Sequence, residues 1–111
     1  MNQQFKSCIE ACLACATACN QCTTECLNEE DVKMLLKCIE LNRQCSVICN
    51  AAAQLMAIAG EHAKHLCKEC AEICRACAEE CEKHAAHGMS HCRKCAEACQ
   101  KCAAECEKMA A

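Results

Sequence analysis

The sequence contains no proline, tryptophan or tyrosine, and phenylalanine occurs once, at Phe5. Glycine occurs only twice, at Gly60 and Gly88. A chain so poor in turn-forming and aromatic residues is typical of long helices joined by short turns. Because the usual large aromatic side chains are missing, the interior has to be built from smaller groups.

Long apolar segments and clusters of basic residues are also absent. No stretch approaches the roughly 18 apolar residues that a membrane-spanning helix needs, and the net charge of −3 is spread along the chain. We therefore expect neither a membrane nor a nucleic acid as a partner. The first residues show no basic region followed by an apolar run, so no export signal is predicted and the expected location is the cytoplasm.

Cysteine is the residue that the sequence has in excess, with 19 among 111 residues. The first six, from Cys8 to Cys26, are spaced four, three, four, three and four residues apart. The same rhythm returns at 67–81 and at 92–106. This spacing keeps the side chains on one narrow stripe of an α-helix, so the sequence predicts helices that carry a face of thiol groups.

The cysteine stripes and the two glycines predict one domain over residues 1–111, with helices at about 3–27, 31–59, 61–86 and 90–109. We expect Gly60 to end the second helix in a left-handed conformation, Gly88 to end the third, and Ser90 to cap the fourth. Short turns place consecutive helices antiparallel. The predicted fold is therefore all-α, an antiparallel up-down-up-down four-helix bundle with a cysteine-lined interior.

The second predicted helix has the same inward-facing stripe, but apolar residues take the place of many of the cysteines. We expect Met34, Leu41 and Ile48 on its inner face together with its three cysteines. Leu35 and five other apolar residues are predicted to lie off this stripe. They would either widen the core-facing surface or pack on a neighbouring subunit.

Sixteen of the cysteines form eight Cys-x-x-x-Cys pairs, which place two sulfur atoms one helical turn apart. Cu(I) accepts two ligands in a near-linear arrangement and is selected by soft thiolates. If every copper ion takes two thiolates and every thiolate bridges two copper ions, the ratio is one copper per cysteine and the buried core is neutral. The pattern thus indicates cytosolic storage or buffering of multiple Cu(I) ions per chain, with loading that releases protons and weakens at low pH.

Other metals remain as alternatives on the sequence alone. Zinc prefers four tetrahedral ligands, which one helix face cannot give although facing helices can. Sharing thiolates among Zn²⁺ ions also leaves a net negative charge. An iron–sulfur site is disfavoured, because the bacterial ferredoxin pattern ends in Cys-Pro and lies on loops. A zinc or mixed soft-metal sink is therefore the main alternative among metal-binding functions.

Cysteines can also serve without any metal. Neighbours on one helix hold their Cβ atoms about 5–6 Å apart, beyond the roughly 3.5–4.5 Å of a relaxed disulfide. A structural disulfide framework is therefore disfavoured, whereas a thiol redox buffer that cycles disulfides and cysteines that merely fill space stay open. No cysteine stands apart beside a base, so we do not predict an enzyme.

The candidate ligands are all of the cysteines and three histidines near the last predicted turn. His84 is in phase with the thiol stripe and is expected to look into the bundle, while His87 and His91 lie where copper would enter; exposure to solvent is the alternative for each. Met56 and Met109 are interpreted as core filler. The predicted ligands are Cys8, Cys12, Cys15, Cys19, Cys22, Cys26, Cys38, Cys45, Cys49, Cys67, Cys70, Cys74, Cys77, Cys81, Cys92, Cys95, Cys99, Cys102, Cys106, His84, His87 and His91.

This pattern resembles the bacterial copper storage proteins, a family of cysteine-lined four-helix bundles. The resemblance covers essentially the whole chain and rests on the repeated Cys-x-x-x-Cys pairs and on the sparser Cys38, Cys45 and Cys49. It is closest to the cytosolic branch, which lacks a twin-arginine export signal. It implies a homotetramer in which each subunit stores many Cu(I) ions through inward-facing thiolates. It does not indicate which protein delivers or withdraws the copper.

Overall fold

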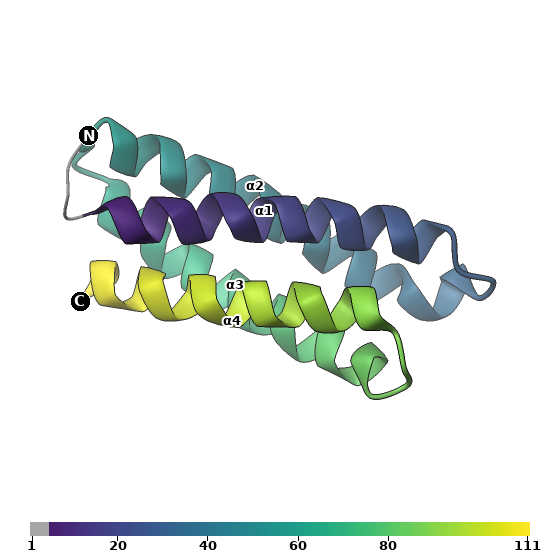
Figure 1. Cartoon of the computed structure of the whole chain (residues 1–111). Coiled ribbons are helices and arrows are strands. Elements are labelled where there is room, and N and C mark those ends of the chain that lie inside the picture. Colours follow the sequence, from purple (N-terminus) through teal and green to yellow (C-terminus); the bar gives the residue numbers. More distant parts are fainter. Residues whose placement is uncertain (1–4) are drawn as a thin grey trace.

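Four long α-helices and one short 3-10 helix form the regular structure of residues 5–111, the part of the chain that this computed structural model describes. Figure 1 shows the long helices running in alternating directions, with the start of α1 and the end of α4 at one end of the bundle. α1 and α3 each pack against both α2 and α4. The predicted up-down-up-down four-helix bundle is confirmed. The elements are α1 (Lys6–Leu27), η2 (Val32–Leu35), α2 (Leu36–Ala57), α3 (Ala63–Ala85) and α4 (Ser90–Ala110).

Cysteine and alanine make up most of the core. Buried alanines such as Ala11, Ala53, Ala78 and Ala103 flank the cysteine stripes of the four helices. Alanine favours helix formation and lets neighbouring helices approach closely. The result is a slender body with extents of 44 × 18 × 17 Å.

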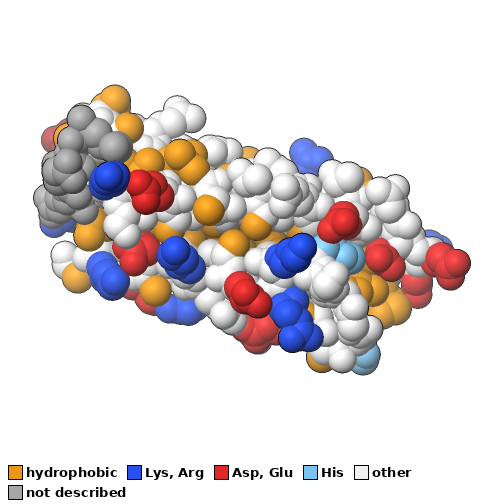
Figure 2. Space-filling model, in the orientation of Figure 1, with side chains coloured by type: hydrophobic (Ala, Val, Ile, Leu, Met, Phe, Trp, Pro, Cys, Tyr) orange, Lys and Arg blue, Asp and Glu red, His pale blue; other side chains and the backbone are white. Residues whose placement is uncertain are grey.

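Most charged side chains lie outside this core, and Glu80 is the buried exception among the described residues. Figure 2 shows acidic and basic groups mixed over the visible face of the bundle. None of the helices within residues 5–111 combines the length and the apolar character that crossing a membrane requires.

The helices α2 and α3 end in the same way. At the end of α2, Ala59 takes a left-handed φ of 53° and the Gly60 N–H donates to the Leu55 carbonyl at 2.9 Å. At the end of α3, Gly88 has a φ of 90° and the next N–H donates to the His84 carbonyl at 3.3 Å. These bonds form Schellman motifs. The predicted role of Gly88 is confirmed, whereas the prediction for Gly60 is wrong because the preceding alanine takes the left-handed position.

The start of the second predicted helix differs from the prediction. A 3-10 turn precedes α2, so the α-helix begins at Leu36 and not at Asp31. A 3-10 helix has about three residues per turn, so positions three apart share a face. Leu35, three residues before Cys38, is therefore fully buried, and Met34 is 53% exposed. Placing Met34 on the core-facing stripe was wrong, and Leu35 takes that place.

The remaining helix ends also depart slightly from the predicted bounds. The predicted start at residue 3 lies outside the described residues, and α1 begins at Lys6. At the start of α4, Met89 occupies the N-cap position and no side chain caps the helix. Ser90 is the first residue of that helix, so the prediction that it caps α4 was wrong.

Candidate metal centre

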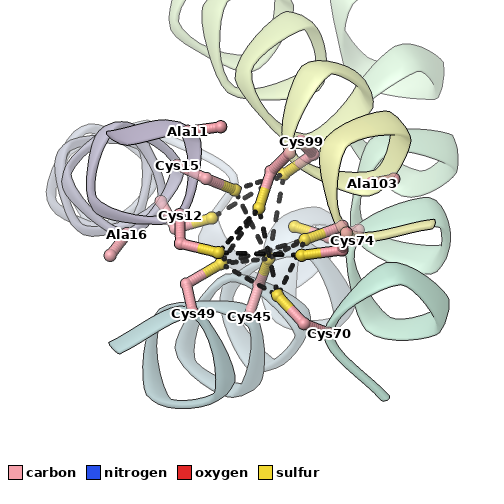
Figure 3. Close-up of a cluster of buried hydrophobic side chains, with 14 of the residues drawn as sticks. Ala11, Cys12, Cys15, Ala16, Cys45, Cys49, Cys70, Cys74, Cys99 and Ala103 are labelled. Carbon is pink, nitrogen blue, oxygen red and sulfur yellow. Dashed lines mark hydrogen bonds between the residues drawn. The ribbon is translucent and has the colours of Figure 1, made fainter. Parts of the chain in front are cut away.

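All 19 cysteine side chains point into the bundle as free thiols, and none is more than 1% exposed. They come from all four long helices, because each helix turns its cysteine stripe inward. Figure 3 shows the sulfur atoms of Cys12, Cys49, Cys74 and Cys99 converging from the four sides. The sequence prediction that the cysteines share one interior is confirmed.

The shortest sulfur contacts connect different helices. Cys45 and Cys74 hold their Sγ atoms 3.5 Å apart, and Cys15 and Cys99 hold theirs 3.6 Å apart. Within one Cys-x-x-x-Cys pair the distance is longer, at 3.9 Å between Cys45 and Cys49. Metal–thiolate bonds are about 2.3 Å long for zinc, so these sulfurs are spaced closely enough to share an ion. An ion can therefore be held between helices as well as along one of them.

The sulfur atoms form overlapping groups of four, and within each group all ligand atoms lie within 4.8 Å of one another. Two of the groups share Cys15 and Cys45, and a further group shares Cys19 and Cys99 with one of these. This sharing links three of the groups, and the Cys102 Sγ of a fourth group lies 3.8 Å from the Cys49 Sγ, so the sulfur atoms form a continuous path. The groups include Cys12–Cys70–Cys102–Cys106, Cys15–Cys45–Cys49–Cys74, Cys15–Cys19–Cys45–Cys99 and Cys19–Cys77–Cys95–Cys99.

Thiols packed so closely hold their protons unequally. Hydrogen bonds with Cys15 and Cys19, together with burial, raise the pKa of Cys99. Hydrogen bonds from Cys26 and Cys38 lower the pKa of Cys22, although burial opposes this. A buried thiolate needs such donors or a cation beside it, because an uncompensated buried charge is very unfavourable. A metal cation that replaces the shared protons meets this need.

Asn42 is a buried polar residue that the sequence analysis missed. Its side chain is fully buried among the thiols. Its Oδ1 atom accepts hydrogen bonds from the Cys77 thiol at 3.1 Å and from the Cys95 thiol at 3.3 Å. Its Nδ2 atom donates to the Cys38 Sγ at 3.8 Å. One neutral amide thus contacts thiols from three helices.

The spacing of the second helix contained a signal for this residue. Asn42 follows Cys38 by four residues and precedes Cys45 by three, which is the rhythm of the other stripes. Leu41, which the sequence analysis placed on the inner face, also fits a three-and-four spacing between Cys38 and Cys45. Leu41 and Ile48 are only half-buried, so their placement on the inner stripe was wrong. The spacing of the cysteines alone is compatible with either Leu41 or Asn42 on the inner face.

His91 is the histidine that the structure brings to the thiols. Its Nε2 atom lies 3.6 Å from the Cys26 Sγ, and its Nδ1 atom lies 4.0 Å from the Glu25 carboxylate. Together with Cys22, Cys26 and Cys92 it forms a group of four ligand atoms within 4.8 Å. This group lies at the end of the bundle that carries the α1–α2 and α3–α4 connections (Figure 1).

The two other candidate histidines have different surroundings. His84 is buried, but its Nε2–H donates to the Glu80 carboxylate at 2.9 Å. Lys83 lies 3.4 Å from the same carboxylate. Burial raises the pKa of Glu80, yet the hydrogen bonds from His84 and Lys83 outweigh it, so this pKa is lowered overall. His87 is exposed. The bundle end thus contains one histidine in contact with a thiol and one hydrogen-bonded to a buried carboxylate.

The sequence profile of the copper storage protein family matches residues 1–111. The chain belongs to this family. A curated cysteine-rich protein of Bacillus subtilis (strain 168), the uncharacterized YhjQ, is 45% identical over 67 residues, which span 60% of this chain and 62% of that relative. Family membership therefore rests on the whole chain, while this relative matches only part of it.

Solved structures of family members are similar over nearly the full length. The Cu(I)-bound copper storage protein BsCsp3 is 45% identical, with a TM-score of 0.91, and the match covers 98% of this chain and 100% of that chain. A cytosolic copper storage protein from Streptomyces lividans, loaded with five coppers, is 37% identical, with a TM-score of 0.93 and coverage of 97% and 92%. At these identities the similarity supports both the fold and the family.

Proposed function

We propose that this protein stores Cu(I) ions in its interior, where the inward-facing cysteine thiolates hold them. The observation that carries the proposal is the set of overlapping sulfur groups. Together they draw cysteines from all four long helices, and within each group the ligand atoms lie within 4.8 Å of one another. Membership of the copper storage protein family and the likeness to a Cu(I)-bound relative support the choice of metal.

The ligands of the store are the 19 cysteines, with His91 added at one end. The continuous path of sulfur atoms allows each thiolate to bridge two neighbouring copper ions. Bridging of this kind gives one copper per cysteine and leaves the buried core without net charge. Each bound Cu(I) replaces one thiol proton, because the buried thiols are protonated before loading. His84 and His87 are not part of this ligand set, since one is paired with Glu80 and the other is exposed.

The proposal also covers the cellular location and the oligomeric state of the protein. We place the protein in the cytoplasm, as is stated for the Streptomyces lividans relative, and assign it storage without catalysis. A homotetramer is proposed from the resemblance to the copper storage proteins, and α2 exposes apolar side chains that a subunit contact would cover. Val47 is 69% exposed and Leu36 is 54% exposed, and Val47 lines a shallow groove with Ile48 and Ile73. Contiguous exposed apolar surface of this kind marks interaction sites.

The test of storage is an anaerobic titration of the fully reduced protein with Cu(I) against a competing chelator, followed by desalting and counting of the metal. We expect a tightly held ratio near one copper per cysteine. A plateau of one or two ions, or copper that the chelator removes easily, would contradict storage. Sedimentation equilibrium of the same samples tests the tetramer, and a monomer at every concentration would contradict it.

A zinc store is the second candidate, because the groups of four sulfurs also offer the tetrahedral arrangement that zinc prefers. Four thiolates around Zn²⁺ leave two negative charges inside the bundle, which makes this candidate less favourable than copper. A competition experiment, in which zinc-loaded protein is treated with Cu(I) and then desalted, distinguishes the two metals. Zinc that survives an excess of Cu(I) in the desalted protein would reverse the order.

A further inference from the structure

Met56 and Cys67 form a buried sulfur pair near the end of the bundle that holds the α2–α3 turn. The Met56 side chain is fully buried in the last turns of α2. Its thioether Sδ lies 3.6 Å from the Cys67 Sγ, which belongs to the first turns of α3. The thioether therefore faces a thiol and does not simply pack against carbon.

Cys67 differs from most cysteines because it has no Cys-x-x-x-Cys partner. Ala63 and Ala71 occupy the positions four residues before and after it, and both are buried alanines. Nearby, Cys8 and Cys106 contact each other, with their Sγ atoms 3.6 Å apart. Cys67 therefore needs a ligand from another helix if it is to hold a two-coordinate ion. The side-chain hydrogen bonds of Cys67 reach the Cys8 and Cys106 thiols, so other helices offer these two thiols and the Met56 thioether.

The charge balance at the end of a row of ions favours a neutral ligand. Inside the row each thiolate is shared by two copper ions, but the last ion has no neighbour beyond it to share a second thiolate. Two unshared thiolates around the last Cu⁺ would leave a buried negative charge, which is unfavourable. A thioether is soft, like the thiolates that select Cu(I), and it carries no charge. One thiolate and one thioether leave the end of the row neutral.

We propose that Met56 is a copper ligand, and that its Sδ atom and the Cys67 Sγ atom together bind the terminal Cu(I) ion at this end of the bundle. The site rests on the proposed copper storage and adds a thioether to a ligand set otherwise made of cysteines and His91. It replaces the interpretation of Met56 as core filler, which would not require the sulfur to face a thiol.

The test uses selenomethionine-labelled protein loaded with Cu(I) under anaerobic conditions, and measures X-ray absorption at the selenium edge. We expect a copper neighbour of selenium in the wild-type chain. The M56L variant, which keeps a buried apolar side chain, should lose this signal and bind one copper ion fewer. The M109L variant is the matched control, because Met109 is half-buried against the same core, and it should keep the signal.

Three results would overturn the proposal. A loaded wild-type protein without a copper neighbour of selenium would remove Met56 from the ligand set while leaving storage intact. A signal that persists in M56L would assign it to another methionine. A protein that takes up no copper would contradict storage itself and the terminal site with it. If M56L does not fold, a wild-type spectrum without a copper neighbour still overturns the proposal, and a copper neighbour seen in the wild type must persist in the M34L/M89L/M109L variant, which keeps Met56.

Discussion

Cys77 donates its S–H to the Oδ1 atom of Asn42 across 3.1 Å, which connects α3 to α2 inside the thiol core. The same oxygen accepts from Cys95 on α4. Since the amide is neutral and much less soft than sulfur, it contributes hydrogen bonds to the metal-free bundle where a cysteine would have contributed a ligand. The second helix thus combines three of the proposed copper ligands with polar contacts to its neighbours.

Replacing Asn42 should weaken the metal-free protein. N42A removes the acceptor of several thiol hydrogen bonds and leaves a small cavity, so we expect the free energy of unfolding to fall by about 1–3 kcal/mol. Urea denaturation of the reduced apo protein measures it. The control is N50A, in the same helix but exposed. Equal losses in the two variants would mean that the buried amide contributes nothing specific.

The two Schellman motifs predict opposite effects of glycine and alanine. Ala59 is strained at its left-handed φ of 53°, so A59G should raise the free energy of unfolding by roughly 0.5–1 kcal/mol. G88A should lower it by roughly 1–2 kcal/mol through backbone strain alone, since an added Cβ at Gly88 would meet no atom within 4 Å.

Thermal or chemical unfolding of the apo protein tests both substitutions. The matched control is A57G, at the last residue of α2. A glycine there adds chain entropy without relieving strain, so this variant should lose roughly 0.5–1 kcal/mol. If A59G were destabilised as much as A57G, the left-handed conformation of Ala59 would be refuted.

The buried carboxylate of Glu80 predicts a stability that depends on pH. Its pKa in the folded protein is lowered, because the hydrogen bonds from His84 and Lys83 outweigh burial. The ionised carboxylate therefore stabilises the fold above its unfolded pKa of about 4.3. That contribution is lost as the pH falls through the lower folded value.

We expect E80Q to be less stable than the wild type by about 1–3 kcal/mol near neutral pH, and the difference to shrink in acid. Urea denaturation of the apo protein at a series of pH values measures it. The control is E79Q, since Glu79 is the exposed neighbour. A difference that stays constant into acid would show that the charge of Glu80 is not the cause.

His91 should affect the uptake of copper more than the total amount stored. Its half-buried ring reaches the Cys26 thiol at 3.6 Å and offers a nitrogen ligand at one end of the sulfur path. We expect H91A to take up Cu(I) more slowly and to hold at most one ion fewer. Stopped-flow absorbance of the thiolate–copper bands measures the rate. The control is H65A, which changes an exposed histidine; equal rates in both variants would remove His91 from the uptake route.

The inward position of the cysteines could be predicted from the sequence because alternating spacings of three and four define a helix face without further information. The second helix was harder. The 3-10 turn before α2 changes the register, and a sequence does not show where such a turn replaces an α-turn, so Met34 was chosen in place of Leu35. Asn42 was missed because the thiols that satisfy its amide come from α3 and α4, which its own neighbours in the sequence do not reveal.

The complete burial of the thiols has a consequence for how this chain coexists with other proteins. A polypeptide with 19 accessible cysteines would exchange disulfides with its neighbours and link to further copies of itself. In this fold the surface accessible to another protein consists largely of alanine, amide and charged side chains, and the sulfur atoms lie inside the bundle. The chain therefore has many thiols that do not react with other proteins. Thiol–disulfide exchange requires that the bundle opens or that a reagent enters through one of its ends.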